Sequence, residues 1–174
     1  MAPKAVVLDV KHSQLIQAPP ARVMAAFFST SDLAGWWQVV RAVIVARPLG
    51  MYAIEWESTP FKDDVLGHLG GTFHGIMIDY REDAAFFLAE AYWQPPQGEP
   101  IGPMALEVHC HPHADGRSTM LSVRQSGEGD GPRWARYFQI MSQGWEGALQ
   151  EMKNYMDNEA ERNRRYDEWQ RSRS

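Results

Sequence analysis

Residues 133–157, RWARYFQIMSQGWEGALQEMKNYMD, decide the fold of this chain. On an α-helix at 100° per residue, their apolar members fall on one side, in a stripe about 120° wide. These members are Trp134, Tyr137, Phe138, Met141, Trp145, Ala148, Leu149, Met152, Tyr155 and Met156. Gly131 and Pro132 precede the stretch, and proline is favoured in a first helical turn. At 1.5 Å per residue the helix is about 37 Å long, so it needs a broad apolar surface to lie on.

The composition is that of a single globular domain. The chain has 174 residues, a net charge of −5 and a pI near 5.7. An acidic balance argues against a protein whose main role is to hold phosphate backbones. The single cysteine, Cys110, excludes an internal disulfide and favours a reducing compartment. Because we find no signal-peptide core and no apolar run of ~18–20 residues, we expect a cytoplasmic protein with no membrane span and no nucleic-acid partner.

Upstream of the helix, seven segments have the composition and alternation of β-strands. They are residues 5–16, 39–46, 51–57, 72–80, 84–93, 104–111 and 118–126. Two short helices are expected after the first strand, over residues 21–28 and after the capping cluster Ser29–Asp32. Strands joined by short turns form an antiparallel sheet, whose concave face the long helix must cover. The predicted fold class is therefore α+β, with a six- to seven-stranded curved antiparallel sheet wrapped around a long C-terminal helix.

Three polar segments interrupt this pattern. Residues 58–71 exceed the usual length of a connection and are interpreted as a structureless, mobile rim or lid. Residues 94–103 contain four prolines and two glycines and are predicted to be a second long loop. Residues 158–174 are nearly all charged or polar, which is typical of a charged tail or a frayed helix extension. The domain is therefore expected to span residues 1–157.

Several short motifs resemble those of one superfamily in their order along the chain. They are Ile16-x-Ala18-Pro19-Pro20-x-x-Val23, Leu33-x-x-Trp36-Trp37, Leu49-Gly50-Met51-Tyr52, Gly75-Ile76-Met77-Ile78-Asp79, and Gly144-Trp145 with Leu149 and Lys153. Together they resemble the helix-grip fold of the START/Bet v 1-like (SRPBCC) superfamily, in the branch similar to the C-terminal domain of the Hsp90 ATPase activator Aha1. The resemblance covers roughly residues 8–157. It departs from the family pattern at Leu49, where relatives carry glycine, and in the two long loops.

This resemblance implies a cavity between the sheet and the long helix. Members of the superfamily include carriers of hydrophobic ligands, polyketide cyclases and proteins with no assigned role, so the fold alone does not choose an activity. We expect the cavity to bind a small hydrophobic molecule. Two alternatives stay open: a chaperone-ATPase regulator similar to Aha1, with an Hsp90-type chaperone as partner, and, with less support, an enzyme of the polyketide cyclase or aromatase kind.

Large apolar side chains of the predicted sheet and helices are the candidate ligand-binding residues. They are Trp37, Tyr52, Trp56, Phe73, Phe87, Trp93, Met141 and Trp145. The alternative is that these side chains simply fill a core. His74 shares its parity with Ile76 and Ile78, so we predict that it points into the cavity, where it would orient a ligand or act as a general base. The alternative for His74 is a structural role near a strand end.

The remaining residues with chemical potential favour a binding protein over an enzyme. His109 and His111 alternate with the apolar Val108 and Cys110, so the histidines are predicted to face solvent and the thiol to face inward and be inert. We find no pair of inward carboxylates, no nucleophile motif and no phosphate-binding loop. The sequence therefore predicts no catalytic residue, no metal ligand and no cofactor.

Overall fold

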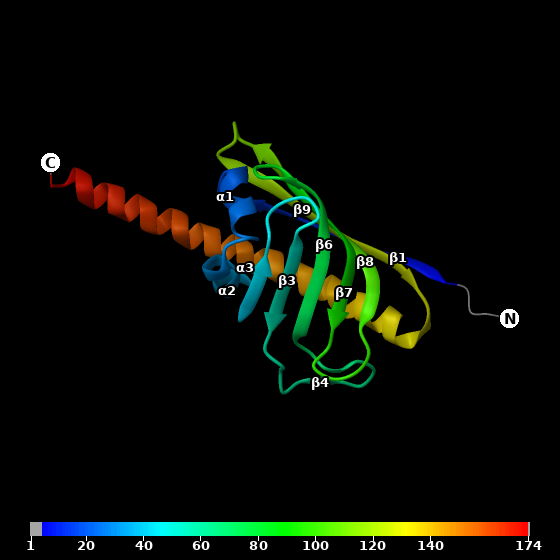
Figure 1. Ribbon diagram of the computed structural model, residues 1–174. Helices are drawn as coiled ribbons and strands as arrows, with labels where there is room; N and C mark the ends of the chain where they lie inside the picture. The colour runs from blue at the N-terminus through cyan, green and yellow to red at the C-terminus, as the bar shows by residue number, and fades with distance from the viewer. Residues whose placement is uncertain (1–4, 174) are drawn as a thin grey trace.

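A seven-stranded antiparallel sheet curves around one long helix in the computed structural model, which describes residues 5–173 (Figure 1). Its strands are β1 (Val6–Ile16), β2 (Arg41–Ile44), β3 (Met51–Trp56), β6 (Gly71–Arg81), β7 (Ala85–Gln94), β8 (Ile101–His113) and β9 (Ser118–Gly129). The strand order is β1-β9-β8-β7-β6-β3-β2. The helices are α1 (Pro20–Ala25), α2 (Thr30–Trp37) and α3 (Gly131–Arg171). The predicted α+β helix-grip fold is confirmed. Residues 1–4 and 174, which the sequence assigned to the domain and the tail, lie outside the described part.

The short helices begin at the signals that the sequence carries. Pro20 occupies the first turn of α1, where its missing N–H costs no hydrogen bond. Ser29 caps α2, because its Oγ accepts a hydrogen bond from the backbone N–H of Asp32 at 3.3 Å. Helix α2 ends at Gln38, whose backbone is left-handed with φ 59°. This end of α2 places Trp37 against Trp145 of α3.

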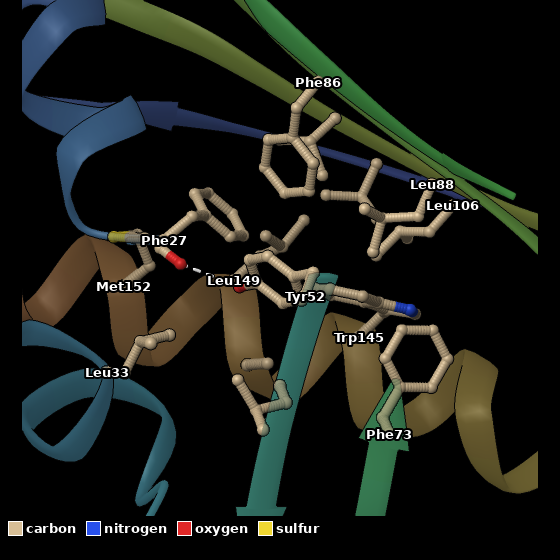
Figure 2. Packing of buried hydrophobic residues seen from close by; sticks show 14 of the residues in the cluster. Phe27, Leu33, Tyr52, Phe73, Phe86, Leu88, Leu106, Trp145, Leu149 and Met152 are labelled. Atoms are coloured by element: carbon tan, nitrogen blue, oxygen red, sulfur yellow. Dashed lines mark hydrogen bonds between the residues drawn. The ribbon is translucent and has the colours of Figure 1, made fainter. Parts of the chain in front are cut away.

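The core lies between the concave face of the sheet and the apolar stripe of α3. Leu149 and Met152 of α3 belong to the same buried cluster as Phe27, Phe86 and Leu88 (Figure 2). Each of these side chains is at most 2% exposed. Full burial of one such side chain stabilises the folded state by about 1.5–3 kcal/mol. The stripe of α3 is therefore the main element that holds the sheet in its curved shape.

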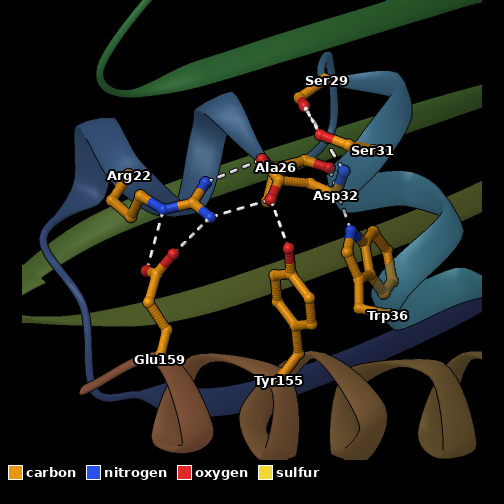
Figure 3. A network of polar contacts seen from close by, with 8 residues as sticks. All are labelled: Arg22, Ala26, Ser29, Ser31, Asp32, Trp36, Tyr155 and Glu159. Carbon is orange, nitrogen blue, oxygen red and sulfur yellow. Dashed lines mark hydrogen bonds and ion pairs between the residues drawn. The ribbon is translucent and has the colours of Figure 1, made fainter. Parts of the chain in front are cut away.

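A polar network joins the two short helices to α3 (Figure 3). The guanidinium of Arg22 in α1 donates to both carboxylate oxygens of Asp32 in α2, each at 2.8 Å. It also donates to both oxygens of Glu159 in α3, at 3.0 and 2.9 Å, and the Tyr155 hydroxyl donates to Asp32 at 2.5 Å. The hydrogen bonds from Arg22 are the main cause that lowers the pKa of Asp32 below its usual value. All three helices thus meet at one charge-assisted cluster.

Helix α3 continues to Arg171, beyond the end of its apolar stripe, and this last part projects away from the sheet (Figure 1). The sequence left residues 158–174 as either a charged tail or a helix extension, and in the structure residues 158–171 are helical. Ion pairs within the extension support it: Glu161 pairs with Arg164 and Arg165, and Arg164 also pairs with Glu168. Pairs at these spacings stabilise a helix without any partner surface. None of the helices in residues 5–173 combines the length and the apolar character that crossing a bilayer requires.

The prediction of a structureless loop over residues 58–71 is wrong in that detail. The segment contains a small hairpin of two short strands, β4 (Lys62–Asp63) and β5 (Gly67–His68). The Asp63 side chain forms its turn by accepting hydrogen bonds from the backbone N–H groups of Val65 and Leu66, each at 3.0 Å. Aspartate commonly builds turns in this way, so Asp63 was the local signal for the hairpin.

The second long loop is also shorter than predicted. Strand β8 begins at Ile101, three positions before the predicted start at Met104, because Ile101 pairs with Trp93 of β7. Only residues 95–100 connect the two strands, which is an ordinary length for such a connection.

We propose that the folded domain ends near Ala160 and predict that a chain stopped after this residue keeps its stability. Glu159 of α3 pairs with Arg22 of α1, and residues 162–173 beyond it are exposed. The midpoint of urea unfolding, followed by far-UV circular dichroism, should therefore stay at the full-length value. As a comparison, Met152→Ala, at a position that is 0% exposed, should lose about 2–5 kcal/mol. A truncated chain as destabilised as Met152→Ala would show that the extension belongs to the folded domain.

Candidate ligand-binding site

A cavity of about 590 Å³ lies between α3 and the end of the sheet at which β3 and β7 finish. Its walls come from the end of α2, from β3, β6, β7 and β9, from the β4–β5 hairpin and from α3. The lining residues are Trp37, Gln38, Val40, Trp56, Glu57, Thr59, Leu66, Leu69, Gly70, Phe73, Trp93, Gln125, Tyr137, Ile140, Met141, Gly144 and Trp145. Small-molecule sites in proteins occupy about 300–1,000 Å³, so the cavity has the size of a ligand site.

Tryptophan rings that pack against one another form one part of the cavity wall. Trp37 lies between Trp56 and Trp145, with ring centroids 5.1 and 4.9 Å apart. The indole N–H of Trp56 donates to the carbonyl of Trp37 at 2.9 Å, and that of Trp93 donates to the carbonyl of Gly70 at 2.8 Å. Because the backbone takes these N–H groups, Trp56 and Trp93 offer the cavity ring carbon rather than hydrogen-bond donors.

The Gln125 side chain is a buried polar group in this apolar wall. The Gln125 side chain, on β9, is 1% exposed and accepts a hydrogen bond from the Trp145 indole N–H at 2.8 Å. Its amide nitrogen donates to the Tyr137 hydroxyl at 3.1 Å and to the Met104 sulfur at 3.4 Å. The Tyr137 ring stacks on Trp93 with centroids 5.3 Å apart. Burial raises the pKa of Tyr137 above its usual value, so the hydroxyl stays protonated at neutral pH.

The β4–β5 hairpin covers one side of the cavity with Leu66 and Leu69. It is fixed to α3 by Arg136, whose Nε and Nη2 both donate to one oxygen of Asp63, at 2.9 and 2.7 Å. The Asp63 side chain is 3% exposed, whereas that of Arg136 is 40% exposed. Hydrogen bonds from Arg136 lower the pKa of Asp63 to about 2. The hairpin is therefore a cover held in place by one ion pair.

The mouth of the cavity opens to solvent. Val40, Glu57, Thr59 and Gly144 line the cavity and are themselves exposed. Glu57 is the one charged residue in the described lining, which contains no histidine, lysine or arginine. A ligand inside the cavity is thus surrounded by neutral groups, with a single carboxylate at the rim.

Six of the nine predicted ligand-binding residues line this cavity. They are Trp37, Trp56, Phe73, Trp93, Met141 and Trp145. Tyr52 lies instead in the filled part of the core, where it is 1% exposed and its hydroxyl donates to the carbonyl of Phe27 at 2.7 Å. The prediction placed Tyr52 on the correct face of β3 but at the wrong end of the core.

The prediction that His74 points into the cavity is wrong. His74 is exposed on the outer face of the sheet, where it stacks on Tyr92 with centroids 5.9 Å apart. The inward residues of β6 are Phe73 and Met77. The parity argument took Ile76 and Ile78 as inward, but both are outward and exposed. This part of the outer face is apolar, so hydrophobicity did not distinguish the two faces of the strand.

Phe87 also lies outside the cavity. Phe86 and Leu88 face inward, and Phe87 faces outward opposite Glu107 of β8. The register shifts between Leu88 and Ala91, and Glu90 in this interval has φ 48°. Such a bulge inserts one residue and exchanges the two faces of the strand beyond it. The prediction assumed that Phe87 faces the same way as Trp93. Trp93 does face inward, but the bulge lies between the two residues, so the alternation does not carry over to Phe87.

Two buried lining residues with polar atoms, Gln125 and Tyr137, were missed as site residues from the sequence. Tyr137 belonged to the apolar stripe of the helix but was not selected as a site residue. Gln125 lies on the same face of β9 as Leu121 and Val123, which are both buried. A polar residue at an inward position was therefore the available signal. Leu66 and Leu69 gave no such signal, because only the hairpin of the folded chain brings them to the cavity.

The His109–His113 segment does not contribute to the cavity. Cys110 faces inward as predicted, and burial raises the pKa of its thiol to about 12. His109 and His111 stack on each other on the opposite face, with centroids 5.7 Å apart. Within residues 5–173, no three His, Cys, Asp or Glu side chains are grouped closely enough to hold a metal ion.

We predict that Asp63→Asn loosens the hairpin without unfolding the protein. The amide has no negative charge and so cannot form the ion pair with Arg136, which weakens the contact, and backbone amides of residues 62–69 should therefore exchange hydrogen faster at pH 7, measured by hydrogen–deuterium exchange with mass spectrometry. The matched control is Asp9→Asn, which breaks an exposed pair with Arg124 on the outer face of the sheet. Equal exchange of the hairpin in both variants would contradict a fastening role for Asp63.

The same pair gives the wild-type hairpin a dependence on pH. The pKa of Asp63 is about 2 in the folded protein, against 3.8 for an unperturbed aspartate, the value taken for the unfolded chain. A lowered folded pKa means that the stabilisation is complete above about pH 4 and is lost as the pH falls toward 2. Protection of the hairpin amides should decrease in this window in the wild type and stay flat in Asp63→Asn.

The chain was compared with known families and structures. Residues 17–157 match the family described as Activator of Hsp90 ATPase homolog 1-like protein. No curated protein matches the chain. Among solved structures, the protein of unknown function SA2116 from Staphylococcus aureus is 14% identical, with a TM-score of 0.66, over 91% of this chain and 98% of that one.

Two further structures share the architecture. CV1439 from Chromobacterium violaceum is 21% identical, with a TM-score of 0.59, over 85% of this chain and 96% of that one. The di-domain ARO/CYC protein BexL from the BE-7585A biosynthetic pathway is 12% identical, with a TM-score of 0.64, over 86% of this chain and 46% of that one. At these identities the likeness establishes the fold alone. Because the family match spans most of the sequence, the chain belongs to the Activator of Hsp90 ATPase homolog 1-like family, within the START/Bet v 1-like superfamily.

Proposed function

We propose that this protein binds a small, neutral, hydrophobic molecule in the cavity between the sheet and α3. The observation that carries the proposal is an aromatic cavity of about 590 Å³ that opens to solvent and whose lining, among residues 5–173, has Glu57 at its mouth as the one charged residue. Burial of apolar surface supplies affinity at about 25 cal/mol per Å², before the cost of ordering the ligand. The free Cys110 favours a reducing compartment, so we propose the cytoplasm as its location.

The cavity lining supports binding rather than catalysis. A cyclase or aromatase of this fold needs a group that moves protons beside the substrate, and the described lining contains one carboxylate, Glu57, at the exposed rim. His74, the histidine that the enzyme alternative would have used, lies on the outer face of the sheet. Enzymatic turnover therefore has less support than binding.

We predict that Gly144→Phe abolishes binding. Gly144 lines the cavity, and a Cβ atom added there would meet no atom within 4 Å, so we expect the phenyl ring to occupy the open space of the cavity. The neutral fluorescent probe N-phenyl-1-naphthylamine should bind the wild type and lose at least tenfold in affinity in the variant. Native mass spectrometry of freshly purified wild type should also retain an apolar adduct that the variant lacks.

Gly147→Phe is the matched control. Gly147 lies on the same helix with equally open space around its Cβ, but it does not line the cavity. Both substitutions remove a glycine from a helix interior, which favours the helix by similar amounts. Unimpaired probe binding by Gly144→Phe, or equal loss in both variants, would contradict binding in this cavity.

A second candidate function is regulation of a chaperone ATPase, and one observation favours it. The outer face of the sheet near its β2 edge exposes apolar side chains from β2, β3 and β6. They include Val43, Met51, Ile76 and Ile78, which are 41–57% exposed. Exposed apolar patches mark protein-binding surfaces. Stimulation of the ATPase of an Hsp90-type chaperone by the wild type, and its loss in a Met51→Lys variant that still binds the probe, would favour this function.

A further inference from the structure

The orientation of the Gln125 amide is fixed by its neighbours. The Trp145 indole N–H can only donate, so the atom of Gln125 that it contacts at 2.8 Å must be the amide oxygen. The amide nitrogen therefore faces the Tyr137 hydroxyl at 3.1 Å and the Met104 sulfur at 3.4 Å. Each of the two N–H bonds of this amide has one of these partners, so Gln125 has no donor left for a ligand.

This orientation makes the Tyr137 oxygen an acceptor and leaves its own proton without a partner. Tyr137 is only 3% exposed, and its hydroxyl hydrogen has no acceptor among the described residues. The ring is packed between neighbours: it stacks on Trp93, and it meets Phe138 edge to face with ring centroids 5.7 Å apart. Tyr137 and Gln125 both line the cavity. A buried O–H donor without an acceptor is costly, and a ligand oxygen would satisfy it.

The other side-chain donors in the wall either donate to protein oxygens or belong to residues that are not fully buried. The indole N–H groups of Trp56, Trp93 and Trp145 all donate to protein oxygens. Trp37 is half-buried, and its N–H is not among the buried groups without a partner. Tyr137 is thus the buried donor that the described lining keeps for a ligand.

The charge of the lining restricts the ligand further. The lining has no cation among its described residues, and Glu57 at the mouth is negative. A carboxylate or phosphate ligand would lose its hydration there without gaining a countercharge, which is strongly unfavourable. A neutral ligand oxygen needs only the single hydrogen bond that Tyr137 can give.

We infer that Tyr137 is the residue that determines specificity and that the cavity selects neutral, largely apolar molecules with one hydrogen-bond acceptor oxygen, of the ketone or ester class. In this arrangement the Tyr137 hydroxyl donates to the ligand carbonyl, and Gln125 positions the hydroxyl. The inference rests on the ligand-binding function proposed above and adds the chemical class of the ligand.

The test compares two probes of nearly equal shape, 2-acetylnaphthalene and 2-isopropylnaphthalene, in which a carbonyl oxygen of the first stands where the second has a methyl group. Because water solvates the ketone more strongly, the ketone-to-hydrocarbon affinity ratio is compared between proteins. Tyr137→Phe keeps the ring and removes the donor, so isothermal titration calorimetry should give a ratio about 2- to 12-fold lower than in the wild type, the value of one net hydrogen bond, while the hydrocarbon binds as before.

Tyr52→Phe is the matched control, since it also removes one buried tyrosine hydroxyl. Tyr52 does not line the cavity, and its hydroxyl donates to the Phe27 carbonyl. This variant should keep the ketone-to-hydrocarbon affinity ratio of the wild type. A second measurement needs no variant: the infrared carbonyl stretch of 2-acetylnaphthalene bound to the wild type should lie below its frequency in hexane.

The outcomes separate the inference from the function on which it rests. If neither probe binds the wild type, the proposed binding function fails. If the bound carbonyl stretches as in hexane, the cavity binds ligands but the assignment of Tyr137 is overturned. That assignment is also overturned if Tyr137→Phe keeps the ketone-to-hydrocarbon affinity ratio of the wild type.

Discussion

The apolar stripe of α3 must be buried, and the rest of the molecule is arranged to bury it. A helix of this length cannot hide one face against another helix of the chain, because α1 and α2 are short. The sheet supplies the required surface by curving around the helix. Where the facing side chains meet, as Phe27, Phe86 and Leu149 do, the core is filled (Figure 2). At the other end the facing aromatic side chains stand around a cavity.

Two arginines, Arg22 and Arg136, fasten the elements that the stripe alone does not hold by pairing with carboxylates. Arg22 joins the short helices to α3 through Asp32 and Glu159 at one end of the core. Arg136 fastens the β4–β5 hairpin over the cavity through Asp63. In both places the planar guanidinium makes several hydrogen bonds at once, which adds geometric precision to the attraction between charges. The Arg22 pairs lie at the filled end of the core, and the Arg136–Asp63 pair holds the hairpin over the hollow end.

The relation of this chain to its family follows from the same construction. The helix-grip arrangement needs only a stripe, a curved sheet and two closing helices, and very different sequences satisfy these needs. Structures that are 12–21% identical to this chain therefore share its fold. Chemistry resides in the few side chains around the cavity. In this chain the buried part of the described lining includes tryptophan rings, Gln125 and Tyr137, and these side chains are the basis of the neutral ligand proposed above.

The sequence by itself determined the features that depend on local periodicity. The 3.6-residue repeat of α3, the strand alternation and the caps at Pro20 and Ser29 predicted the fold and most of the aromatic lining. Tertiary structure decided what periodicity does not encode. A bulge near Glu90 reversed the faces of β7, so Phe87 turned outward. An apolar outer face misled the assignment of His74. Only the folded chain sets Gln125 between Trp145 and Tyr137, because these hydrogen bonds join residues that are distant in sequence.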